Sequence, residues 1–178
     1  MNVALRHNLS FSIFFAILYI ALFKLTVLIG VQGYFGGSAS PIFLPAFVRL
    51  LAFLVLDYWA IPSLFVAGLF CVDLGLGMEG RAVVSAFLAI GGPLGTSIAS
   101  HAIGVRPNLA NLTPVKLLSL SLACALGNAI FYNIGLAIAG IEMHFAARFF
   151  VIFAGDVLGT WVMIYAIKLA MARISRFR

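Results

Sequence analysis

Apolar residues in this chain occur in long runs that few polar positions interrupt. The last run, from 149 to 172, contains only Asp156, Thr160 and Lys168 as markedly polar positions. A helix that crosses a bilayer requires about 20 apolar residues. The pattern predicts six such helices, the second and third of them short and joined by the turn "LDYWAIP", at 9–32, 42–57, 60–77, 82–104, 115–140 and 147–172.

The composition places the chain among integral membrane proteins. Of its 178 residues, 64% are hydrophobic and 9% are charged, and the mean hydropathy is +1.18. A soluble domain carries about 25% charged residues. We therefore expect an all-α, polytopic transmembrane bundle that forms a single domain over residues 1–178. A lipid bilayer is its expected environment, and there is no room for a separate soluble domain.

The net charge of +6 indicates membrane orientation rather than nucleic-acid binding. Nucleic-acid binders cluster Lys and Arg on a solvated face, whereas here the cations lie at segment ends and in short loops. Six spans place both termini on one side, and cytoplasmic segments are enriched in Lys and Arg. We expect both termini in the cytoplasm and a multi-pass protein of the bacterial cytoplasmic (inner) membrane. The opposite side has Arg81 and Arg148, and the terminal side has Arg6, Arg106, Lys116, Arg173, Arg176 and Arg178.

Two stretches contain residues that interrupt a helix. "GGSASPIFLPAF" places Pro41 and Pro45 before the second predicted helix, and "AIGGPLGTS" places Gly91, Gly92 and Pro93 inside the fourth. Backbone groups freed by such breaks often line cavities. The alternative is an ordinary kink, or a helix that begins at proline.

Glycines spaced four apart predict close helix contacts. Gly91 with Gly95, and Gly155 with Gly159, form small-xxx-small pairs of the kind that let membrane helices approach. Asp156 lies about 100° from the Gly155 stripe, so its carboxylate is expected to flank a tight contact.

Charged and amide side chains inside the predicted spans fall at similar depths. At 1.5 Å per helical residue, Lys24 lies about 12 Å from the outer end of its helix, and Arg49 and Asn133 about 10 Å. The same count gives about 6 Å for Asp73 and about 13 Å for Asp156. Ionisable residues within spans usually face the bundle interior and pair with each other. Asp156 and Arg49 are the best match in depth, and Lys24 is a second candidate partner.

This charged layer has two interpretations. It is either a structural clasp that fixes the order of the helices, or a ligand or ion pocket that opens to the outside. An enzyme is not expected, because the sequence has no HExxH, P-loop, GxSxG or Cys/His cluster. No cofactor or metal site is expected either, and Cys71 and Cys124 are interpreted as buried thiols.

Two stretches resemble a known family. "SASPIFLPAFVRLLAFLVLDYWAIPSLFVAGL" (38–69) and "FAGDVLGTWVMIYAIKLAMA" (153–172) resemble the bacterial membrane-associated sensor (MASE-type) domain. The shared features are the prolines before a helix, the aromatic turn at 57–59, and the Gly-Asp-x-x-Gly start of the late helix. The resemblance implies a stand-alone, shortened sensor module in signal transduction, acting through a protein partner such as an output kinase or cyclase.

Two other functions are compatible with the sequence. A six-helix protein of this size also resembles the substrate-binding component of a vitamin-type membrane transporter, which implies a small-molecule ligand. Against that, the expected Ala-xxx-Ala stripe is absent from the first helix, where Ala16 and Ala21 are five apart. The third function is a structural subunit of a membrane complex.

Overall fold

A computed structural model describes residues 3–29, 39–106, 108–141 and 145–175. Every element in these residues is a helix: α1 Val3–Leu28, α2 Pro45–Leu56, a 3-10 turn η1 Asp57–Trp59, α3 Ala60–Cys71, α4 Met78–Ala102, α5 Pro114–Ile138 and α6 Phe145–Ile174. Five helical stretches among the described residues are long and apolar enough to cross a membrane, with Pro45–Cys71 counted as one. The chain is therefore an all-helical protein suited to a lipid bilayer.

Several predicted helix ends were wrong. The first helix begins at Val3 rather than 9, and the end predicted at 32 lies outside the described residues. The third was predicted to reach 77 but ends at Cys71, because Val72 is extended and Gly75 has a positive φ of 69°. The turn 72–77 is apolar in composition, so hydropathy alone did not separate it from the helix.

The stretch Pro45–Cys71 folds back on itself at the aromatic turn. Along α4, Arg49 lies against Gly92 and Tyr58 hydrogen-bonds Ser97 at 3.0 Å. α3 then runs back along α4, because Gly68 near the end of α3 lies against Ser85 nearer the start of α4. Each arm has 12 residues, which is about 18 Å and shorter than the roughly 30 Å hydrocarbon core. The two short helices form a hairpin whose turn contains Asp57, with φ 53°.

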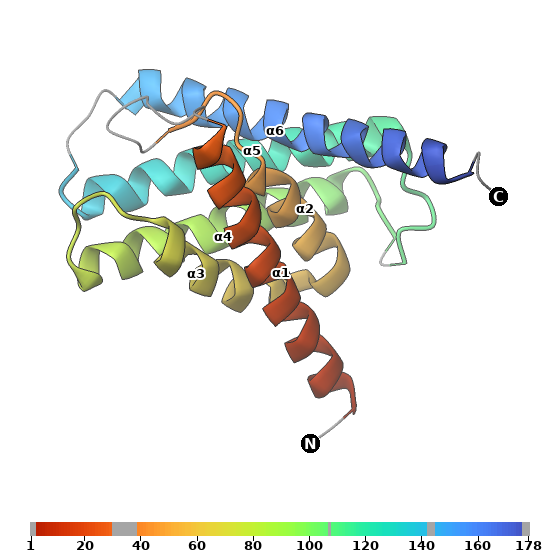
Figure 1. Cartoon of the computed structure of the whole chain (residues 1–178), viewed down its shortest axis with the longest axis horizontal. Coiled ribbons are helices and arrows are strands. Elements are labelled where there is room, and N and C mark those ends of the chain that lie inside the picture. The colour runs from red at the N-terminus through yellow and green to blue at the C-terminus, as the bar shows by residue number, and fades with distance from the viewer. Residues whose placement is uncertain (1–2, 30–38, 107, 142–144, 176–178) are drawn as a thin grey trace.

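The three C-terminal helices lie side by side, and α1 crosses them at a steep angle over the α2–α3 hairpin (Figure 1). Helices α5 and α6 are antiparallel: Trp161 donates to Ser121 at 3.2 Å near one end, and Arg148 donates to Asn133 at 2.6 Å near the other. This arrangement leaves a space between α1, α3, α5 and α6 at one end of the bundle.

Glycines hold α4 against α5. A methyl group at Gly95 would overlap the carbonyl oxygen of Ala123, and one at Gly127 would overlap that of Gly91. Of the two interpretations of Gly92 and Pro93, a helix break is wrong, since α4 runs without interruption from Met78 to Ala102 with Pro93 inside it. The glycines of α4 therefore permit close packing instead of breaking the helix.

Gly155 and Gly159 contact a non-helical segment rather than another helix. A methyl group at Gly155 would overlap the carbonyl oxygen of Ser40, and one at Gly159 would overlap that of Phe43. The amide of Phe43 donates to the carbonyl of Gly155 at 2.9 Å. Residues 39–44 thus lie directly on α6 beside Asp156, and α2 begins at the depth of that carboxylate.

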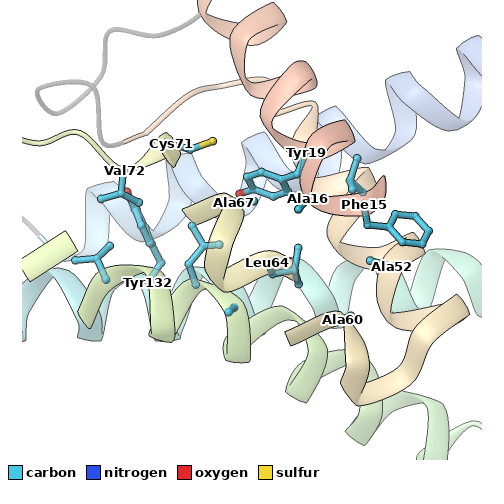
Figure 2. Packing of buried hydrophobic residues seen from close by; sticks show 14 of the residues in the cluster. Phe15, Ala16, Tyr19, Ala52, Ala60, Leu64, Ala67, Cys71, Val72 and Tyr132 are labelled. Carbon is cyan, nitrogen blue, oxygen red and sulfur yellow. The ribbon is translucent and has the colours of Figure 1, made fainter. Parts of the chain in front are cut away.

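Buried residues of α3 bring α1 and α4 close to the hairpin. Ala60, Leu64 and Ala67 on α3 are completely buried, and Tyr19 of α1 belongs to the same apolar cluster. Figure 2 shows these side chains together with Tyr132 of α5. The apolar core therefore lies between the hairpin, α1 and α5.

Candidate functional site

A cavity of about 310 Å³ lies where α1, α3, α5 and α6 meet the segment 39–44. Four of the five residues predicted for the charged layer line it, namely Lys24, Arg49, Asp73 and Asp156. The fifth, Asn133, is buried elsewhere. Residues from six separate stretches of the chain thus meet around one space.

Arg49 and Asp156 form an ion pair in the cavity wall. Arg49 Nη1 lies 2.7 Å from Asp156 Oδ2, and the two residues are 1% and 3% exposed. Asn128 Nδ2 donates to the same Oδ2 at 2.7 Å, and Arg49 Nη2 donates to Tyr19 Oη at 3.2 Å. The pair therefore joins α1, α2, α5 and α6.

The surroundings of Arg49 fix its position. Its aliphatic stem passes over Gly92, where a methyl group would overlap Cδ. The guanidinium carbon lies 6.0 Å from the ring centre of Tyr19 and 5.9 Å from that of Phe43, which is cation–π range. Arg49 reaches Asp156 because α4 has no side chain at Gly92.

Only one oxygen of the Asp156 carboxylate accepts hydrogen bonds from the described residues. Both of its hydrogen bonds end on Oδ2, and no described residue donates to Oδ1. The side-chain oxygen of Asn128 and Nε of Arg49 are buried and have no partner in the described part of the chain. Two acceptor atoms and one donor atom beside the ion pair are thus left unpaired.

Lys24 and Asp73 lie at the rim of the cavity. Both are exposed, and Asp73 follows the end of α3 instead of lying within it, so its predicted helical depth was wrong. Cys71, at the last position of α3, lines the cavity and is 8% exposed. Figure 2 shows Cys71 and Val72 with Tyr19 and Tyr132, which come from α1 and α5 and line the same space.

Asn133 belongs to a second polar cluster. Its side-chain oxygen accepts from Arg148 Nε at 2.6 Å, and its amide donates to the Ala129 carbonyl at 2.7 Å. Arg148 was predicted to be an outer loop cation, but it lies in the first turn of α6 and is 1% exposed. Asn133 therefore orients this buried arginine and does not line the cavity.

Sequence reasoning missed Asn128, Tyr19, Tyr132 and the role of Arg148. Asn128 had a usable signal, because an amide in an apolar helix usually faces the bundle interior and hydrogen-bonds there. Tyr19 and Tyr132 had none, since aromatic residues are frequent throughout the chain. Among the described residues, no group of three or more His, Cys, Asp or Glu side chains is placed to hold a metal ion.

Comparison of the chain with protein-family models, with curated proteins and with solved structures finds no match.

Proposed function

We propose that this chain is a six-crossing protein of the bacterial inner membrane that binds a small molecule in the cavity and signals through a protein partner. The observation that carries the proposal is the Arg49–Asp156 pair, which borders an open cavity of about 310 Å³. Small-molecule pockets have volumes of roughly 300–1,000 Å³ and combine apolar walls with a few polar groups.

The order of contacts supports six crossings. The hairpin turn lies near Ser97 and Ser12, toward the terminal side of α4 and α1, while Cys71 lies near Lys24 at the opposite end. In this proposal, residues 39–44 extend α2 into one crossing, and the turns 57–59 and 72–77 on either side of α3 extend it into the next. Both termini are then on one side, which the excess of Lys and Arg places in the cytoplasm. The burial of Arg148 removes one of the two cations counted against this orientation.

The pocket interpretation is favoured over a pure clasp. A clasp requires only that the two charges neutralise each other in a packed interior. Among the described residues, Asp156 Oδ1 and the neighbouring Asn128 oxygen have no donor, and Arg49 Nε has no acceptor. Buried polar atoms normally have partners, so unpaired polar atoms beside a cavity favour a bound molecule.

The ion pair also supports a route from the ligand to a partner. Asp156 lies in α6, which continues from the cavity to Ile174 at the terminal side of the bundle. A ligand that binds Asp156 or Arg49 changes the link between α6 and the hairpin. The sensor family that the two sequence stretches resemble acts on a kinase or cyclase, and we propose a partner of this kind for α6.

The same cavity supports a second function, the substrate-binding component of a vitamin-type transporter. A structural subunit would retain the ion pair but would not need a ligand. A stoichiometric membrane partner that co-purifies without a ligand would favour that third role.

Thermal unfolding of the purified protein with a panel of small metabolites tests the proposal. We expect at least one compound to raise the Tm of the wild-type protein and to leave unchanged the Tm of a variant in which Leu88→Trp fills the cavity. Leu88 lines the cavity and is 6% exposed. If every stabilising compound acts equally on both proteins, the cavity is not the binding site.

A further inference from the structure

We infer that the ligand is a zwitterion of amino-acid size with an apolar or aromatic body. This inference rests on the proposed ligand-binding function, and it adds the chemical class of the ligand. Three features of the cavity carry it: the balance of charge, the unpaired donor and acceptor atoms beside the ion pair, and the apolar walls.

The charges of the described residues that line the cavity sum to zero. Lys24 and Arg49 are balanced by Asp73 and Asp156. A ligand with a net charge would leave an uncompensated charge in a site of low dielectric constant, which is costly. A net-neutral ligand avoids that cost.

Polar atoms of both kinds lack a partner beside the cavity. Among the described residues, Asp156 Oδ1 and Asn128 Oδ1 accept no hydrogen bond, and Arg49 Nε donates none. An ammonium group has three N–H donors and no acceptor, so it suits the Asp156 carboxylate, whereas a carboxylate suits the Arg49 guanidinium and the exposed ammonium of Lys24. The cavity therefore matches a molecule that carries both an ammonium and a carboxylate.

The remaining walls are apolar and the volume is small. Phe23, Phe43 and Phe70 line the cavity together with Leu88 and Ile152. The volume of about 310 Å³ is at the lower end of the range for ligand pockets. An apolar side chain of amino-acid size suits these walls, whereas a nucleotide carries too much charge and volume.

Cys71 provides a reporter for this binding. It lines the cavity, and the only other cysteine, Cys124, is buried beside Gly92. In protein carrying Cys124→Ser, the rate at which a maleimide labels Cys71 is measured with four compounds of similar shape. These are L-phenylalanine (zwitterion), 3-phenylpropanoate (anion), 2-phenylethylamine (cation) and 3-phenylpropanamide (uncharged). L-Leucine, L-methionine and L-tryptophan extend the set of zwitterions.

We expect at least one zwitterion to slow the labelling about elevenfold at ten times its Kd, because only unoccupied protein then reacts. The singly charged analogues should require concentrations at least about tenfold higher, which corresponds to about 1.4 kcal/mol. Asp156→Asn should reverse the preference toward 3-phenylpropanoate, and Lys24→Met should shift it toward 2-phenylethylamine. Lys24 is exposed, so its variant is expected to fold even where the Asp156 variant does not.

Two results would overturn the zwitterion assignment. One is equal or better protection by a singly charged compound, and the other is protection by 3-phenylpropanamide alone. Either result would leave the proposed binding function intact, because the cavity would still hold a ligand. A third result is that no zwitterion protects Cys71 while a metabolite stabilises the wild-type protein and not Leu88→Trp. The zwitterion assignment is then wrong, and the proposed binding function stands. If neither assay detects a ligand, both fail.

Discussion

Replacing both Arg49 and Asp156 by uncharged residues should lower the free energy of unfolding less than replacing either one alone. The variants are Arg49→Met, which keeps the aliphatic stem over Gly92, and Asp156→Asn, which keeps the side-chain size. Both residues are almost fully buried and lie 2.7 Å apart. Each single variant therefore leaves the other charge without its counter-ion in the interior.

The structure gives the size of these effects. Removing one partner of a buried ion pair costs about 3–5 kcal/mol, whereas replacing both with uncharged side chains is often close to neutral. Asn128 and Tyr19 still hydrogen-bond the remaining charges, which places each single variant at the lower end, about 3 kcal/mol. The sum is about 6 kcal/mol, and the double variant should lose no more than about 2 kcal/mol.

Unfolding by SDS in mixed micelles, followed by the fluorescence of Trp59 and Trp161, measures the four free energies. The control cycle pairs Asp156→Asn with Arg173→Met, because Arg173 is exposed in the last turn of α6. The control cycle should be additive. Additivity within about 0.5 kcal/mol in the Arg49 cycle would refute the energetic role of the ion pair.

Three further variants, with Gly77→Ala as a control for the first, test the rest of the fold. Gly155→Ala should destabilise the protein by about 1–3 kcal/mol in the same unfolding assay, since the added methyl overlaps the Ser40 carbonyl. Gly77→Ala, with no neighbour within 4 Å, should change little, and equal effects would argue against close packing of 39–44 on α6. Asn133→Leu should cost about 1.5–3 kcal/mol, because it removes a hydrogen bond to the charged Arg148; an unchanged unfolding midpoint would contradict it. Tyr19→Phe should cost about 0.5–3 kcal/mol, from one hydrogen bond to a buried cation, and a variant as stable as wild type would show that this bond contributes nothing.

The helical architecture could be predicted from the sequence because hydropathy reports directly on contact with lipid. The long apolar runs located α4, α5 and α6 to within a few residues at most ends. Counting depth along the predicted helices also paired Arg49 with Asp156, which the structure places in contact. Depth was informative there because a buried charge needs a partner at its own level.

The remaining features depend on tertiary contacts that composition does not encode. Asp73 was predicted to lie inside a span and is exposed at the rim of the cavity. Arg148 was predicted to lie in a loop and is buried, where it donates to Asn133. The partner of Gly155 is a non-helical segment, and a small-xxx-small pair does not specify whether a helix or a loop packs on it. Asn128 hydrogen-bonds Asp156 because α5 packs against α6 at that level, which the sequence of α5 does not specify.

Labelling of Cys71 from a known side of the membrane tests the central claim most directly. Intact cells or spheroplasts expressing Cys124→Ser protein are treated with a membrane-impermeant maleimide. A second protein, with Ser175→Cys as its single cysteine, reports on the exposed end of α6. The proposed cavity predicts that Cys71 reacts from the outside, while the cysteine at 175 reacts only after the membrane is permeabilised. Reaction of Cys71 only after permeabilisation would contradict an outward-facing ligand cavity.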